Sequence, residues 1–205
     1  MKKIVYDIET VADWSMSSDM MVRLGSKSSR SQGKLNFSPL AIRIICIGAN
    51  CIGEVEPVVF TGEDEKKILT DWVNYINSLS GEMPYRMIGF NCQSFDYPNI
   101  LFKLALHGIP RPRYFPDNKK YGSEYHVDMR SLLTNYDTFA SGTLEDWCCR
   151  HGIEFEDLGH GEDVQGWWNN EDMRHKIADH CKQDLQLTAQ LYLKHENYLP
   201  SYYEN

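Results

Sequence analysis

The order of apolar and polar residues predicts a chain in which strands come first and helices follow. Five runs rich in β-branched and aromatic residues have the length of strands, namely residues 3–6, 41–49, 54–60, 87–90 and 125–129. The first three precede any helical pattern, which indicates an antiparallel meander. We therefore expect an α/β fold built on a mixed five-stranded sheet.

Helices are predicted where apolar residues recur at every third or fourth position. This pattern covers residues 64–79, a stretch from Asp96 to the stop signals Gly108 and Pro110, and the C-terminal segments 132–136, 143–151 and a long one through Asp184 to His195. A turn-rich loop at 159–163 lies between the last two. Helices interleaved with the later strands indicate that they flank the sheet.

Length and charge bound the organisation of the chain and its partners. The 205 residues suffice for one domain, 1–205, and no shift in composition asks for a second. A Ser-, Gly- and Lys-rich stretch at about 12–39 predicts a mobile basic loop, which either closes over a phosphate backbone or is a plain surface loop. The net charge of −8 argues against a protein that coats nucleic acid nonspecifically, but it permits an enzyme that handles a few nucleotides.

Cysteine use and hydropathy indicate the compartment. The six cysteines show no paired Cys-x-x-Cys spacing and lie mostly in apolar surroundings, which favours buried free thiols over disulfides or zinc. No apolar run has the length of a secretory signal or of a bilayer span. We expect a cytoplasmic protein without a membrane partner, of a size that suits a bacterial or phage-infected cell.

Two acidic residues, Asp7 and Glu9, follow the apolar run at the start of the chain. They are two positions apart, so they project from the same face at the end of the predicted strand. Adjacent carboxylates repel each other unless a cation lies between them, and oxygen ligands favour Mg²⁺ or Mn²⁺. The alternative is a pair of solvated acids, so the metal interpretation requires partners elsewhere in the chain.

Candidate partners occur at two later places. Asp96 lies where a buried strand gives way to a helix, and it is either a metal ligand or a helix N-cap. Asn91, just before it, either holds a substrate hydroxyl or phosphate or is a turn residue. His180 and Asp184 are four residues apart and share one helix face, as a functional pair or as a solvated contact.

Together, these segments resemble a known family. Asp7-Ile8-Glu9-Thr10, then Asn91-x3-Phe95-Asp96, then a histidine shortly before Asp184 are similar to the three motifs of DEDD-type 3′–5′ exonucleases, which have a ribonuclease H-like fold. More narrowly, the chain resembles the exonuclease domain related to bacterial DNA polymerase B. The similarity extends to residues 125–128, 143–146 and 161–164. The third motif departs from the family, because His180 stands at the spacing of the tyrosine-type members.

The resemblance implies a function and a role for each motif residue. Asp7, Glu9, Asp96 and Asp184 would hold two Mg²⁺ or Mn²⁺ ions, and His180 would accept or orient the proton of the attacking water. Thr10 and Asn91 would contact the terminal nucleotide. The expected reaction is hydrolysis of single-stranded or frayed DNA from its 3′ end, releasing nucleoside 5′-monophosphates, with a polymerase or another replication or repair protein as a partner in trans. The alternatives are an RNA exonuclease on the same fold and an inactive module that binds nucleic acid.

Several neighbours of the motifs receive structural roles. Asp128, at the end of its strand, is expected to cap a helix, although a supporting role at the metal site is the alternative. We expect His126, His151 and His160 to be structural or surface residues. Trp167 and Trp168 are expected to pack in the core or in a groove, with base stacking as the alternative.

Overall fold

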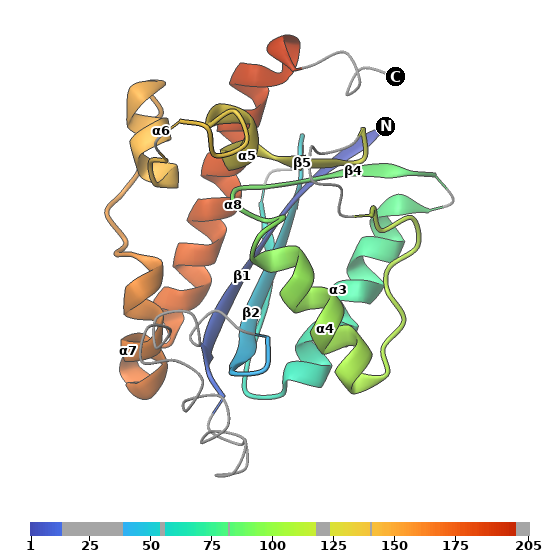
Figure 1. Cartoon of the computed structure of the whole chain (residues 1–205). Coiled ribbons are helices and arrows are strands. Elements are labelled where there is room, and N and C mark those ends of the chain that lie inside the picture. The colour runs from blue at the N-terminus through green and yellow to red at the C-terminus, as the bar shows by residue number, and fades with distance from the viewer. Residues whose placement is uncertain (14–38, 54–55, 82, 118–123, 140, 200–205) are drawn as a thin grey trace.

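The computed structural model describes residues 1–13, 39–53, 56–81, 83–117, 124–139 and 141–199 (Figure 1). Most of the predicted basic loop at about 12–39 lies outside these residues. No described helix has the length and apolar character needed to cross a bilayer. All six cysteines are free, as predicted; Cys149 is exposed and the other five are buried.

A five-stranded mixed sheet forms the centre of the fold, with strand order β3-β2-β1-β4-β5. The strands are β1 (Lys2–Ala12), β2 (Ile42–Cys51), β3 (Val58–Thr61), β4 (Tyr85–Gly89) and β5 (His126–Asp128). β1, β2 and β3 pair antiparallel, whereas β4 pairs parallel with both β1 and β5. The predicted α/β class and the antiparallel arrangement of the first three strands are therefore confirmed.

Helices cover both faces of this sheet. Figure 1 shows α3 and α4 on one side and α6, α7 and α8 on the other. The α-helices are α3 (Glu65–Ser80), α4 (Asp96–His107), α5 (Met129–Leu133), α6 (Leu144–Arg150), α7 (Val164–Asn169) and α8 (His175–His195). Short 3-10 turns occur at Gly161–Asp163, Glu171–Met173 and Glu196–Tyr198.

The central strand β1 separates two hydrophobic cores. Ile4, Tyr6 and Ile8 are buried in the core that α3 and α4 share with the sheet. Val5 and Val11 are buried in the opposite core, together with the apolar side of α8. Because side chains alternate along a strand, Asp7 and Glu9 project between these two valines toward α8.

Some predicted boundaries are wrong. β1 continues to Ala12 because β2 pairs with it along that length, so Asp7 and Glu9 lie within the strand and not at its end. The helix expected at 132–136 occupies Met129–Leu133, because Asp128 caps it and it therefore begins directly after β5. The strand expected at 54–60 is described at Val58–Thr61. Helix α7 was not predicted.

Candidate metal centre

A glycine in β2 allows α8 to approach the sheet where the acidic residues lie. Gly48 is the register partner of Asp7 in the β1–β2 pair. A Cβ atom at Gly48 would lie 2.5 Å from Leu185 Cδ1 and 3.0 Å from Cys181 Sγ, both on α8. The middle of α8 therefore packs directly over β1 at Asp7 and Glu9.

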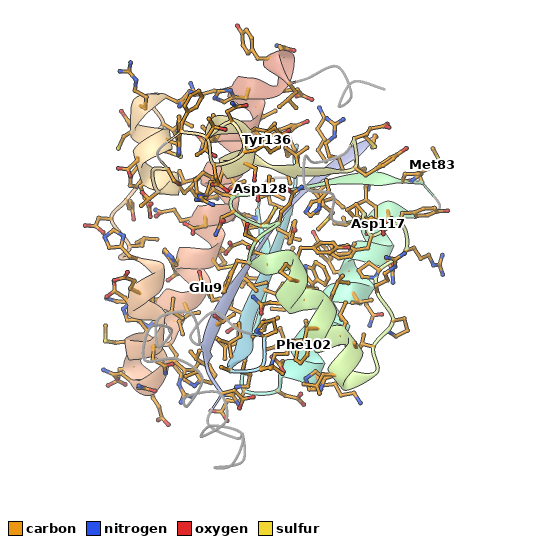
Figure 2. The ribbon with its side chains drawn as sticks, viewed as in Figure 1. Glu9, Met83, Phe102, Asp117, Asp128 and Tyr136 are labelled. Atoms are coloured by element: carbon orange, nitrogen blue, oxygen red, sulfur yellow. The ribbon has the colours of Figure 1, made fainter. Side chains whose placement is uncertain are left out.

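This close packing brings the third predicted motif to the first. His180 Nε2 lies 3.6 Å from Glu9 Oε1 and 3.8 Å from Asp184 Oδ2. Glu9, His180 and Asp184 each offer one ligand atom, and these atoms lie within 4.8 Å of one another. Figure 2 shows Glu9 between β1 and α8. Glu9 and the His180–Asp184 pair, which are distant from each other in sequence, thus form one cluster in which a metal ion could be held.

Asp96 approaches β1 from the side on which β4 pairs with it. β4 pairs with β1 only as far as Val5, which leaves the next part of that β1 edge without a strand partner. Asp96, the first residue of α4, fills this gap, because its Oδ1 accepts a hydrogen bond of 3.1 Å from the Ile8 N–H. The alternative role as an N-cap is wrong, since Phe95 is the N-cap residue of α4 and makes no side-chain capping bond.

The electrostatics of the site favour protonated carboxyl groups in the absence of a cation. Burial, followed by the charges of Asp96 and Asp184, raises the pKa of Asp7 well above its usual value. Burial and then Asp7 do the same to the pKa of Glu9. Burial is also the main cause that raises the pKa of Asp96 to about 7 and that of Asp184 to about 7. A divalent cation would remove this penalty by stabilising the charged forms.

The donor set fits Mg²⁺ or Mn²⁺. Buried Asp7 Oδ2 has no hydrogen-bond partner among the described residues, so it is available as a ligand. A buried polar atom without a partner is uncommon and calls for an explanation. Carboxylate oxygens are the ligands that Mg²⁺ and Mn²⁺ prefer.

His180 is buried at the inner side of the cluster. Its ring packs edge to face against Trp167, with centroids 5.7 Å apart, and the residue is 3% exposed. The alternative of a solvated contact with Asp184 is therefore wrong. Burial lowers the pKa of His180, so its imidazole is neutral near pH 7 and retains a lone pair.

Thr10 and Asn91 are not part of this cluster. Thr10 follows Glu9 at an irregularity of the β1–β2 pairing, where Ile45 is the extra residue. Asn91 has a φ of 60°, which is typical of a tight turn. Its side-chain oxygen accepts a hydrogen bond of 2.9 Å from Arg130 Nη1. The structure therefore places Asn91 as a turn residue, and a contact with nucleotide stays a prediction.

The turn that leads to Asp96 is held by Asp128, the last residue of β5. Asp128 accepts the backbone N–H groups of Asn91 at 2.9 Å and Gln93 at 3.0 Å. It also accepts the Ser131 N–H, which confirms the predicted helix cap. Figure 2 labels Asp128 at this junction of β5 and α5.

Sequence reasoning missed two residues that shape the site. Gly48 had one usable signal, namely an isolated glycine inside an otherwise apolar strand, which often marks a close approach of another element. Arg130 had no such signal, because its contact with Asn91 depends on how the segments after β4 and β5 fold against each other. The expected packing roles are confirmed for Trp167, which is buried in the α8 core, and for His126, which bonds the Tyr6 hydroxyl at 2.8 Å.

Comparisons with known proteins identify the family of this chain. Residues 39–201 match the model of a family described as predicted 3′–5′ exonucleases related to the exonuclease domain of PolB. An uncharacterized protein of Methanocaldococcus jannaschii is 29% identical over 165 residues, which are 76% of this chain and 87% of that protein.

The fold is similar to that of a solved polymerase structure. It superposes on the family B DNA polymerase from the hyperthermophilic archaeon Pyrobaculum calidifontis with a TM-score of 0.72 and 17% sequence identity. The match covers 96% of this chain and 25% of the polymerase chain, so the similarity concerns one part of that enzyme.

Proposed function

Because the chain belongs to the family of predicted 3′–5′ exonucleases related to the exonuclease domain of PolB, we propose that it is a metal-dependent 3′–5′ exonuclease. Its substrate is single-stranded or frayed DNA, from which it hydrolyses the terminal phosphodiester bond and releases a nucleoside 5′-monophosphate. The observation that carries the proposal is the convergence of carboxylates from β1, α4 and α8, all four of which have pKa values raised mainly by burial. An inactive module that only binds nucleic acid would not need these four acids.

Asp7, Glu9, Asp96 and Asp184 would hold two Mg²⁺ or Mn²⁺ ions. Such ions, when bound, lower the pKa of a water molecule and offset the negative charge of the phosphate. Glu9 and Asp184 flank His180 Nε2 at 3.6 and 3.8 Å and so direct this nitrogen into the cluster. His180 can accept the proton of the attacking water there, because burial lowers its pKa and so keeps the imidazole unprotonated. Trp167 covers the other side of the imidazole and keeps bulk water away.

An end-labelled oligonucleotide assay tests the proposal. With Mg²⁺ or Mn²⁺, DNA should shorten stepwise from its 3′ end, and EDTA should stop the reaction. Asp7→Asn should reduce cleavage to background, because the amide keeps the shape of the carboxylate and removes its charge. Asp172→Asn, at an exposed acid in the turn before α8, is the matched control and should cleave normally.

The outcomes separate the candidate activities. Stepwise shortening that survives Asp7→Asn would show that the site is assigned to the wrong residues. An RNA strand of the same sequence, tested in parallel, decides between DNA and RNA as substrate. Binding of both strands without cleavage under any metal would leave only the inactive module.

A further inference from the structure

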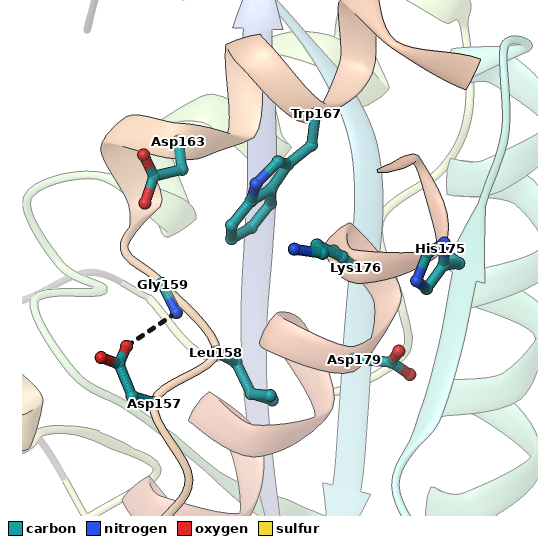
Figure 3. A pocket seen from close by; sticks show the side chains of 8 residues that line it. All are labelled: Asp157, Leu158, Gly159, Asp163, Trp167, His175, Lys176 and Asp179. Atoms are coloured by element: carbon teal, nitrogen blue, oxygen red, sulfur yellow. Dashed lines mark hydrogen bonds between the residues drawn. The ribbon is translucent and has the colours of Figure 1, made fainter. Parts of the chain in front are cut away.

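A pocket of about 420 Å³ opens beside the carboxylate cluster, between the loop at 157–159, α7 and the first turn of α8 (Figure 3). None of the proposed metal ligands lines it. Trp167 connects the two places, because it lines the pocket and also contacts the ring of His180 with centroids 5.7 Å apart. A ligand in this pocket would therefore lie one aromatic ring away from the proposed catalytic histidine.

The loop at 157–159 packs tightly against Trp167 on one side of the pocket. Gly159 has a φ of 89°, and a Cβ atom there would lie 2.6 Å from Trp167 Cζ2. Asp157 Oδ1 accepts the Gly159 N–H at 3.1 Å, and Asp163 Oδ2 accepts the His160 N–H at 2.9 Å. The loop is thus folded against the edge of the indole, and two of the pocket's acids hold it there.

Two further polar side chains of the pocket are available to a ligand. Lys176 and Asp179 come from the first turns of α8, and Figure 3 shows Lys176 extending toward Trp167. Among the residues that the structure describes, neither side chain makes an ion pair or a hydrogen bond. The pocket therefore combines a free ammonium donor, a free carboxylate acceptor and an aromatic ring.

We propose that this pocket binds an unpaired nucleobase that carries an exocyclic amine, from the DNA strand whose end occupies the metal centre. This inference rests on the proposed exonuclease function. Asp179 would accept a hydrogen bond from the exocyclic amine of the base, as carboxylates do from the N4 amine of cytosine. Lys176 would donate a hydrogen bond to a neighbouring acceptor atom of the base ring. Trp167 would contact the base with the part of its indole that lines the pocket.

The charge of the pocket selects the base over the phosphate. The residues that line the pocket include three acids, Asp157, Asp163 and Asp179, and one lysine, Lys176. Excess negative charge repels the phosphate backbone and favours ligand groups that donate hydrogen bonds. Thymine lacks an exocyclic amine, so it has no such donor for a hydrogen bond to Asp179.

Nucleoside binding to the full chain tests this proposal without catalysis. Deoxycytidine and thymidine are titrated in EDTA by calorimetry, and the indole N–H signal of Trp167 is followed by NMR. Deoxycytidine should bind saturably and at least tenfold more tightly than thymidine. Asp179→Ala and Lys176→Ala should each weaken deoxycytidine binding at least tenfold, whereas Lys194→Ala, at an exposed lysine in the last turn of α8, should not change it.

Lys176 and Asp179 are both exposed, so neither alanine variant should disturb folding. Far-UV circular dichroism checks that both variants are folded. The proposal would be overturned by equal affinity for the two nucleosides or by unchanged deoxycytidine binding in both pocket variants. Binding of the free amino acid glycine in place of nucleosides would also overturn it. Absence of nucleoside binding in a chain that degrades DNA would refute the pocket alone. Deoxycytidine binding in a chain that cleaves no nucleic acid would refute the exonuclease function and keep the specificity of the pocket.

Discussion

Replacing Asp184 by asparagine should stabilise the metal-free protein at alkaline pH. Burial, and then the charge of Glu145, raises the pKa of Asp184 from 3.8 to about 7. A carboxyl group whose pKa is higher in the folded than in the unfolded state favours folding only while it is protonated. The stability that this group contributes is therefore present below pH 3.8 and is lost as the pH rises through about 7.

The size of the effect follows from the shift in pKa. One pKa unit corresponds to about 1.4 kcal/mol, so the complete shift corresponds to about 4 kcal/mol. Because neighbouring carboxylates share part of this repulsion, we expect the asparagine variant to exceed the wild type by roughly 2 to 4 kcal/mol at pH 8.5 in EDTA. Near pH 3 the carboxyl is protonated in both the folded and the unfolded state and is as neutral as the amide, so the two proteins should be equally stable.

Urea unfolding at both pH values measures this difference, with the slope of the transition as a check that both proteins unfold in the same way. Adding Mg²⁺ at pH 8.5 should stabilise the wild type more than the variant, since a ligand that binds only the folded state shifts the equilibrium. Asp172→Asn, at an exposed acid, is the control and should follow the wild type at both pH values. Equal stability of wild type and Asp184→Asn at pH 8.5 would refute the reasoning.

Two further changes test how the site is built. Gly48→Ala should destabilise the protein by about 1 to 3 kcal/mol in urea unfolding, because the new methyl group would lie 2.5 Å from Leu185 Cδ1; an unchanged midpoint would show that α8 does not depend on this contact. Asp128→Ala should reduce the cleavage rate by about tenfold or more, because the turn before α4 loses the acceptor of two backbone N–H groups; a normal rate in the labelled-oligonucleotide assay would contradict this.

Sequence patterns predicted which segments form the sheet better than they predicted where its strands end. The apolar runs of β1, β2 and β4 are local properties, so these strands could be read from the sequence. The alternation of side chains along a strand then places Asp7 and Glu9 on one face. The end of β1 could not be read from the sequence, because it depends on pairing with β2. α7 was missed because it is six residues long and follows a turn, so it shows less than two turns of periodicity.

The same distinction applies to the site. The four-residue spacing of His180 and Asp184 placed them on one face of a helix before any fold was known. Their distance from Glu9 depends on how closely α8 approaches β2 at Gly48, which no local pattern contains. The pocket beside Trp167 depends likewise on the fold of the loop against α7.

The hydrogen bond from Ile8 to Asp96 has a consequence for how inactive versions of this protein should be made. The carboxylate serves the backbone of β1 as well as the candidate metal centre, so truncation to alanine would leave a strand N–H without its acceptor. Asparagine separates the two roles, because its amide oxygen can still accept the N–H while the charge is gone. An inactive variant intended for trapping a strand of DNA should therefore be made as Asp96→Asn, which keeps the hydrogen bond to the backbone of β1.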